Sequence, residues 1–301
     1  MKLSTTTGDF AGNFPSSDID RVREIAKAGF KYIDLSLFAG ETERYMGDDW
    51  KIKARELKSI ADDLGVKFVQ MHSYALFEPG EQDDRYDLGL KYTIRSIELC
   101  KELGIPYTVV HGADRKDIVT LEQKYELNRK WYSKLFPVME ETGVEVLGEN
   151  SRIRENDTFV RFYTGKHCYD LAEYVNHPLF HICWDTGHAN FQGSQYQHIV
   201  DLGKHLRALH YNDNNALSDQ HTAPFLGNLN NDEIMSALIK IGYKGYFNFE
   251  CDGFIRKADM RRPFEEECRL KKTPIEVMRQ AEKLLYLIGK SILSAYDLFE
   301  E

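Results

Sequence analysis

The run His181-Ile182-Cys183-Trp184-Asp185-Thr186-Gly187-His188 indicates the fold most directly. Residues of strand character lead to Asp185, and His188 follows three positions later. An alternating run with a carboxylate at its C-terminal end is typical of a sheet or barrel strand that presents a ligand. The three-residue offset lets Asp185 and His188 point into one pocket from a tight turn. The pair alone is a weak signal, but five further strand-like runs also end in a residue of metal-ligand type.

Length and composition suit a single large globular domain. It has 301 residues, of which 42% are hydrophobic and 29% charged, which suits one domain over residues 1–301. No apolar run approaches the roughly 20 residues that a membrane helix needs. The first residues, Met1-Lys2-Leu3-Ser4-Thr5, lack the apolar core of a signal peptide, so we expect a cytoplasmic protein without a membrane partner.

The cysteines and the net charge exclude some classes of site and partner. Five scattered cysteines without a Cys-x-x-Cys pair predict reduced, mostly buried thiols rather than disulfides or a sulfur-rich zinc site. The formal net charge of −9 disfavours nucleic acid as a partner, because such binding depends on phosphate neutralisation. Assembly into a homo-oligomer stays open.

Glycines punctuate the chain at a nearly regular interval. Gly29, Gly65, Gly104 and Gly143 each follow a helical pattern and precede a short β-rich run, at spacings of 36, 39 and 39 residues. Glycine just past a helix supplies the left-handed residue that ends it. Because this spacing is the length of one helix–strand unit, we predict alternating α and β elements.

The resulting units predict eight strands, each followed by a helix, and therefore a (β/α)₈ barrel. An open doubly wound sheet is the rival fold, but no Gly-x-Gly-x-x-Gly turn follows the first strand. The final helix opens at Thr273-Pro274-Ile275-Glu276, with Thr273 as the expected cap. The predicted strands are about 2–6, 32–37, 66–72, 106–111, 144–149, 180–185, 206–211 and 245–250. The helices before the last are predicted near 17–28, 49–64, 88–103, 121–142, 168–176, 196–204 and 231–241.

Six consecutive predicted strands, the third to the eighth, end in His, Asp or Glu. A residue of this kind at one strand end is more often a cap or a solvated side chain than a ligand, but all strand ends of a parallel barrel meet at one mouth. Converging carboxylates repel one another unless a cation or a proton compensates them. The six residues are His72, His111, Glu149, Asp185, His210 and Glu250.

Four of these residues form the predicted metal site. Glu149, Asp185, His210 and Glu250 provide three carboxylates and one imidazole. That mixture suits an octahedral divalent ion such as Mn²⁺, with Zn²⁺, Mg²⁺ and Co²⁺ as the alternatives.

The chain resembles the xylose isomerase-like TIM-barrel superfamily of sugar isomerases and epimerases. The resemblance runs from Asp34 to Glu250, nearly the whole chain. It is carried by Val146-Leu147-Gly148-Glu149-Asn150, Trp184-Asp185-Thr186-Gly187-His188, Leu209-His210-Tyr211-Asn212-Asp213 and Asn248-Phe249-Glu250. It implies that the same four residues bind the metal, that Glu149 and Glu250 also act as acid/base groups, and that His188 contacts the substrate.

The superfamily also contains nucleases of the endonuclease IV type, which use nine ligands for three zinc ions. The resemblance extends to every position of that pattern, so it implies additional metal ligands besides the four. Several sugar-processing members keep much of the set, so the match alone does not establish a nuclease. The five additional ligands are His72, His111, His188, Asp219 and His221.

The leading hypothesis is a metal-dependent isomerase or epimerase of a ketose, an aldose, a sugar phosphate or a related polyol ketone. A carboxylate removes a proton next to the carbonyl, the cation stabilises the enediolate, and a second group returns the proton. Besides His188, His72 and His111 are expected to contact the substrate, and Arg152 could bind a hydroxyl or a phosphate. The alternatives are an endonuclease IV-like phosphodiesterase and a lyase subunit that acts on oxidised glycosides with a partner chain.

Overall fold

One sheet of eight parallel strands forms the centre of the molecule. The computed structural model describes residues 1–301 except 16, 38–41, 76–78, 81–84, 153–159 and 256–272. The strands are hydrogen-bonded in the order β7-β6-β5-β4-β3-β2-β1-β8. They are β1 (Leu3–Thr6), β2 (Tyr32–Ser36), β3 (Lys67–His72), β4 (Tyr107–Val109), β5 (Glu145–Glu149), β6 (Phe180–Asp185), β7 (Leu206–His210) and β8 (Phe247–Phe249).

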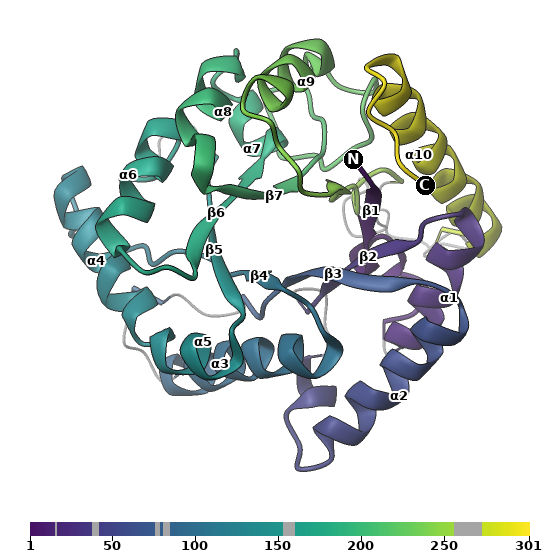
Figure 1. Ribbon diagram of the computed structural model, residues 1–301, viewed down its shortest axis with the longest axis horizontal. Helices are drawn as coiled ribbons and strands as arrows, with labels where there is room; N and C mark the ends of the chain where they lie inside the picture. Colours follow the sequence, from purple (N-terminus) through teal and green to yellow (C-terminus); the bar gives the residue numbers. More distant parts are fainter. Residues whose placement is uncertain (16, 38–41, 76–78, 81–84, 153–159, 256–272) are drawn as a thin grey trace, which may run out of the picture.

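The sheet closes into a barrel between β7 and β8. Tyr211, just past β7, donates its backbone N–H to the carbonyl of Asn248 at 2.8 Å, and the N–H of Glu250 donates to the carbonyl of Tyr211 at 3.2 Å. Figure 1 shows the strands as an inner ring with helices outside it. The predicted (β/α)₈ barrel is therefore confirmed, and each predicted strand overlaps an observed one.

The outer layer differs from the prediction in three places. The helix expected at 121–142 is two helices, because Pro137 lacks a backbone N–H and is tolerated in the first turn of α5 but not inside one long helix. A short helix, α7, replaces the tight turn expected after Asp185. Pro274, not Thr273, holds the capping position of the last helix.

No helix among the described residues is long and apolar enough to cross a membrane. The helices are α1 (Asp18–Ala28), α2 (Trp50–Asp63), α3 (Tyr86–Leu103), α4 (Leu121–Ser133), α5 (Phe136–Thr142), α6 (Gly165–Val175), α7 (Thr186–Asn190), α8 (Tyr196–Leu202), α9 (Asn231–Lys240) and α10 (Ile275–Ala295), with 3₁₀ turns η1 (Thr7–Phe10), η2 (Thr42–Tyr45) and η3 (Gly203–His205).

Local signals in the sequence explain where the helices begin and end. Thr120 and Gln123 form a reciprocal capping box at the start of α4, where both side chains bond to backbone N–H groups. Gly104 and Gly143 follow α3 and α5 with φ of 73° and 72°, the left-handed region that favours glycine. The glycine spacing of the sequence therefore marks true helix ends.

The barrel interior is arranged in layers that follow the two-residue period of the strands. An apolar layer on β4 to β7 contains Val109, Leu147, Cys183 and Ala208, packed with Tyr107. Side chains two residues further along a strand point the same way. The next positions are the ligand-type residues of the same four strand ends, and the apolar layer therefore forms the floor of the mouth.

The cysteines agree with the expectation of reduced thiols. Cys100, Cys168, Cys183 and Cys251 are free and buried. The fifth, Cys268, lies outside the described residues.

Candidate metal centre at the mouth of the barrel

Four side chains from four neighbouring strand ends meet in the barrel mouth. Glu149, Asp185 and His210 end β5, β6 and β7, and Glu250 directly follows β8. One ligand atom of each lies within 4.8 Å of the other three. We call this group the central tetrad. The tetrad consists of the four residues that the sequence pattern predicted as metal ligands.

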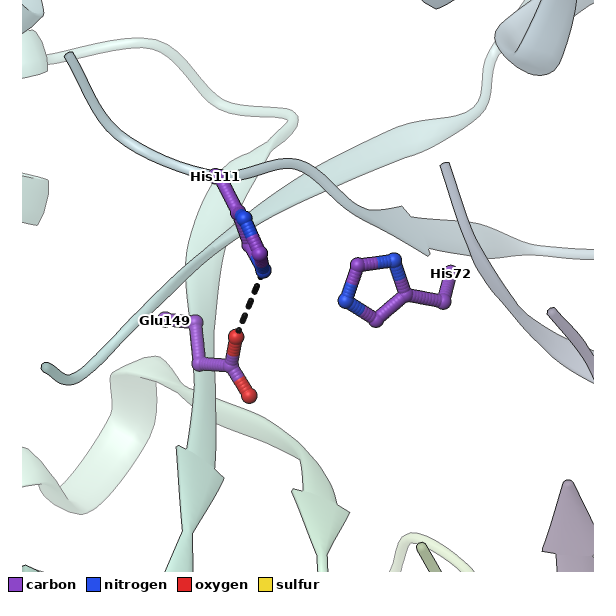
Figure 2. Close-up of side chains that lie close together, drawn as sticks. All are labelled: His72, His111 and Glu149. Atoms are coloured by element: carbon purple, nitrogen blue, oxygen red, sulfur yellow. Dashed lines mark ion pairs between the residues drawn. The ribbon is translucent and has the colours of Figure 1, made fainter. Parts of the chain in front are cut away.

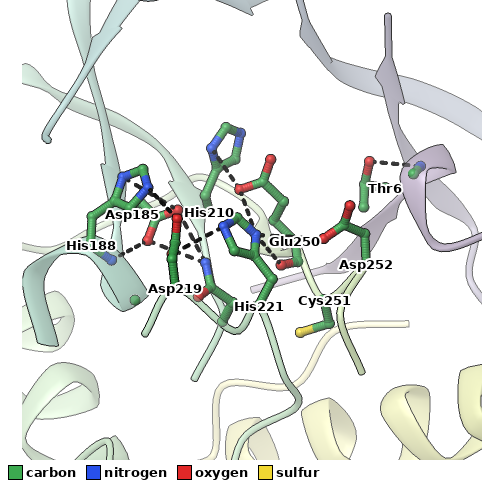
Figure 3. A network of polar contacts seen from close by, with 12 residues as sticks. Thr6, Asp185, His188, His210, Asp219, His221, Glu250, Cys251 and Asp252 are labelled. Atoms are coloured by element: carbon green, nitrogen blue, oxygen red, sulfur yellow. Dashed lines mark hydrogen bonds and ion pairs between the residues drawn. The ribbon is translucent and has the colours of Figure 1, made fainter. Parts of the chain in front are cut away.

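The tetrad has an excess of negative charge, because three carboxylates surround one imidazole. His210 Nδ1 donates to Glu149 Oε1 at 2.5 Å. The same nitrogen lies 3.3 Å from Glu250 Oε2 (Figure 3). Burial opposes ionisation of Glu149, but His210 and His111 outweigh it and hold the pKa of Glu149 well below its usual range. Burial, together with Glu149 and Asp185, raises the pKa of Glu250 well above that range. Without a cation, the repulsion among the carboxylates therefore favours the protonated form of Glu250.

Asp185 is held in place by amide groups that we did not identify in the sequence analysis as site residues. Asn150 pairs with the Asp185 backbone, since its side chain accepts from the N–H at 2.7 Å and donates to the carbonyl at 2.9 Å. Asn212 donates to both carboxylate oxygens, at 3.2 and 3.1 Å. Asp185 Oδ1 also caps α7 by accepting from the N–H of His188 at 2.7 Å. Asn150 directly follows Glu149, and this adjacency to a ligand could have identified it.

A second group lies on the side of β3 and β4. The His111 Nε2 atom is 3.3 Å from Glu149 Oε2, and the rings of His72 and His111 meet edge to face at 4.8 Å (Figure 2). His72 donates its Nδ1 proton to the carbonyl of Ser73 at 3.0 Å. Burial, aided by His111 and His210, lowers the pKa of His72 to about 3, so its ring is neutral at physiological pH.

A third group lies on the opposite side, on α7 and the loop after β7. His188 and His221 both turn Nε2 toward Asp219, at 3.6 Å from Oδ2 and 3.3 Å from Oδ1 (Figure 3). Their Nδ1 atoms donate to the carbonyls of Asn150 at 2.9 Å and Glu250 at 3.2 Å. We call His188, Asp219 and His221 the flanking group. Arg152 joins it, with Nη1 2.8 Å from Asp219 Oδ2.

The flanking group carries its own positive charge. Burial lowers the pKa of His188, but Asp185 and Asp219 outweigh it and raise the pKa to about 10. The same balance, with Asp219 as the largest favourable partner, raises the pKa of His221 to about 9. The two imidazolium rings in turn lower the pKa of Asp219 despite its burial. At neutral pH, Asp219 is therefore surrounded by cationic side chains.

All the predicted site residues line or directly underlie one cavity of about 630 Å³. Its wall also includes a cluster that we did not identify from sequence, in which Asp114 pairs with both Lys124 and Arg161. Asp114 follows β4 and Arg161 precedes α6, so both belong to loops of the mouth. No strand-end pattern marks them in the sequence, which explains why they were missed.

The donor set fits a divalent cation at the central tetrad. Three carboxylates and one imidazole match the oxygen-rich ligation of Mn²⁺ and Mg²⁺, and Zn²⁺ and Co²⁺ accept the same donors. A cation there would also relieve the repulsion that raises the pKa of Glu250.

Comparison with known proteins identifies a family. The family model described as xylose isomerase-like TIM barrel matches residues 22–272. An uncharacterized protein of Methanocaldococcus jannaschii is 24% identical over 200 residues, which is 64% of this chain and 67% of that protein.

Solved structures share the fold at low sequence identity. A D-psicose 3-epimerase from Clostridium cellulolyticum H10 is 16% identical, with a TM-score of 0.74 over 97% of this chain and 99% of that one. The IolI protein, with a bound zinc atom, is 20% identical, with a TM-score of 0.73 over 98% and 99%. A 3-keto-D-glucoside 4-epimerase from E. coli is 18% identical, with a TM-score of 0.67 over 95% and 99%.

Proposed function

We propose that this chain, which belongs to the xylose isomerase-like TIM-barrel family, is a divalent-cation-dependent epimerase or isomerase of a ketose or a related hydroxy-ketone. The observation that carries the proposal is the central tetrad, with its two glutamates on β5 and β8. Sugar epimerases are prominent among the similar structures, and one similar structure holds zinc. Mn²⁺ is the ion that we favour.

Glu149, Asp185, His210 and Glu250 would hold the cation. When bound, it supplies Lewis-acid stabilisation of the negative charge that develops on the substrate oxygens as a carbon-bound proton leaves. Proton transfer itself belongs to the two glutamates. Two strands of the closed barrel separate β5 from β8, so the two carboxylates approach a bound sugar from different sides. One can remove the proton and the other can return it to the opposite face, which inverts the carbon.

Other residues of the mouth would orient the sugar. His188, His72, His111 and Arg152 are our candidates for contacts with its hydroxyl groups. All four line the cavity. Neutral His72 can accept a hydrogen bond at Nε2, because its Nδ1 proton is already donated to Ser73.

The proposal is tested by turnover in D₂O. The Mn²⁺-loaded protein is incubated with D-psicose, D-fructose, D-tagatose, L-ribulose and a 3-keto-D-glucoside, and the products are examined by NMR. We expect deuterium at the carbon that changes configuration, because the proton passes through a glutamate that exchanges with solvent. Product without deuterium, from protein carrying two or more ions per chain, would overturn the proton-transfer mechanism in favour of a hydride shift. A protein that transforms none of these compounds would contradict the substrate class.

A second candidate function, phosphodiester hydrolysis at abasic sites in DNA, is favoured by the grouping of nine ligand-type residues. Glu149 links the tetrad to His72 and His111, and Asp185 links it to His188 and His221, an arrangement that could hold more than one ion. The guanidinium of Arg152 stands against it, because it already neutralises Asp219 of the flanking group. The net charge of −9 also disfavours a DNA partner. Cleavage of an abasic-site duplex by the Zn²⁺-loaded protein, but not by a Glu149→Gln control, would establish this alternative.

A further inference from the structure

The layer beneath the ligands is polar on one side of the barrel, and this polar part surrounds one carboxylate. On β4 to β7 the layer is apolar. On β8, β1, β2 and β3 the corresponding residues are Asn248, Ser4, Asp34 and Gln70, all of them at most 1% exposed. A buried carboxylate is costly unless its partners compensate it, so Asp34 requires a physical explanation.

Asp34 is held rigidly by two amide groups. Gln70 Nε2 donates to Asp34 Oδ2 at 2.9 Å, and Asn248 Nδ2 donates to the same oxygen at 3.0 Å. Ser4 orients Asn248 by donating to its Oδ1 at 2.6 Å. These donors come from three different strands. The carboxylate therefore cannot turn without breaking several buried hydrogen bonds.

The same oxygen faces the one histidine of the central tetrad. His210 Nε2 lies 3.7 Å from Asp34 Oδ2, across the barrel from β7 to β2, while Nδ1 on the other side of the ring faces Glu149 and Glu250. Among the described residues, His210 Nε2 has no hydrogen-bond partner although it is fully buried, and neither has Asp34 Oδ1. A small rotation of the ring would bring Nε2 within hydrogen-bond distance of Asp34.

We infer that Asp34 is the positioning residue of the cation site, accepting the Nε2 proton of His210 while Nδ1 of the same ring binds the cation. A histidine ligand commonly donates its other ring N–H to a carboxylate, which sets the tautomer and makes the ligating nitrogen more basic. The flanking histidines His188 and His221 instead donate Nδ1 to backbone carbonyls and present Nε2. This inference rests on the proposed cation at the central tetrad.

The rival explanation is that Asp34 only ties the strands together. The variant Asp34→Asn separates the two, because it keeps the shape and both accepted hydrogen bonds but removes the negative charge. Burying a neutral amide costs less than burying a carboxylate, so the metal-free variant should unfold at the same temperature as wild type or above it. Loss of the charge beside His210 should weaken binding of Mn²⁺ by about 10- to 100-fold.

The experiment titrates metal-free full-length protein with Mn²⁺ and measures free Mn²⁺ by EPR, with thermal unfolding of the same samples. Ser4→Ala is the matched control, since Ser4 belongs to the same network but does not contact His210. It should bind Mn²⁺ within about threefold of wild type. In the Zn²⁺-loaded wild type, NMR should show His210 as the Nε2–H tautomer with a slowly exchanging proton, and this resonance should move in Asp34→Asn.

Equal Mn²⁺ affinity of Asp34→Asn and wild type would overturn the inference and leave the proposed function intact. So would an Asp34→Asn variant that loses stability and affinity to the same degree as Ser4→Ala, because that is the behaviour of a structural residue. Failure of wild type to bind Mn²⁺ at all would instead contradict the proposed function, and the inference with it.

Discussion

The central tetrad and the flanking group lie side by side in one mouth, yet their buried charges have opposite signs in excess. The tetrad gathers three carboxylates around a single imidazole, and their repulsion helps to raise the pKa of Glu250. The flanking group gathers two imidazolium rings and the guanidinium of Arg152 around a single carboxylate, Asp219. The tetrad lacks positive charge, whereas the flanking group has a surplus.

Burial separates strand ends from loops rather than the two groups, since Glu250 of the tetrad, just past β8, is 17% exposed like Asp219. Asp185 and His210 of the tetrad are fully buried on strand ends, while Asp219 and His221 come from the loop after β7 and keep about a fifth of their side chains exposed, 17% and 21%. A cation therefore stabilises the tetrad directly, but in the flanking group it must displace protons and compete with Arg152. Residues that match a metal-ligand pattern therefore do not by themselves make a site whose charge needs a metal ion to compensate it.

The largest expected effect is the loss of turnover when either glutamate of the tetrad is replaced. Glu149→Gln and Glu250→Gln should each lower turnover by ~10²–10⁴-fold or more, because each removes a proton-transfer group and a ligand. Glu145→Gln is the control, since Glu145 starts β5 and pairs with Arg207 away from the mouth. Initial rates on the substrate found in the D₂O panel provide the measurement. Near wild-type activity of Glu250→Gln would refute the two-glutamate mechanism.

The second largest effect should be on metal content, which should fall when a residue of the tetrad is replaced but not when His188 of the flanking group is replaced. Asp185→Asn keeps the side-chain cap of α7 but removes a charged ligand, so it should weaken binding of the first ion by more than the ~10–100-fold expected for a neighbour of a ligand. His188→Ala should keep nearly the wild-type metal content and lose substrate binding or turnover instead. Elemental analysis after Mn²⁺ reconstitution and gel filtration measures both. If His188→Ala empties the site as Asp185→Asn does, the two groups act as one metal cluster and the comparison fails.

The smallest effect is a pH dependence that distinguishes the groups in metal-free protein. His188 and His221 have folded-state pKa values raised to about 10 and about 9, so the stability they contribute is complete below the unfolded value near 6.5 and is lost as the pH rises through 9 to 10. We expect the free energy of unfolding to fall between pH 7 and 10, because the folded protein then binds more protons than the unfolded chain.

Urea unfolding of chelator-treated protein measures this slope. His221→Gln should flatten it, because it removes one of the two titrating rings. A slope above pH 8 that His221→Gln leaves unchanged would show that the charges are distributed differently from this description.

The sequence by itself determined the barrel and the identity of the residues that meet in its mouth. The glycine spacing and the alternating runs are local signals, and parallel strands necessarily bring their C-terminal ends together. Pro137 is a local signal too, and it divides the helix predicted at 121–142 into α4 and α5. The asparagines that hold Asp185 lie one or two residues after predicted ligands, Asn150 after Glu149 and Asn212 after His210, so the sequence already places them at the mouth.

Only the tertiary structure decided which of these residues form the central tetrad, which form the flanking group, and which atoms they turn toward one another. Whether His210 turns Nδ1 or Nε2 to the glutamates, and whether Asp34 lies beneath it, depends on the register of strands that are far apart in the chain. The structure has register shifts between Ile33 and Asp34 on β2 and between Ile182 and Cys183 on β6, which no two-residue pattern reveals. Arg152 reaches Asp219 across 67 residues of sequence for the same reason, because a contact between two loops is set by the closed barrel that carries them and not by either loop alone.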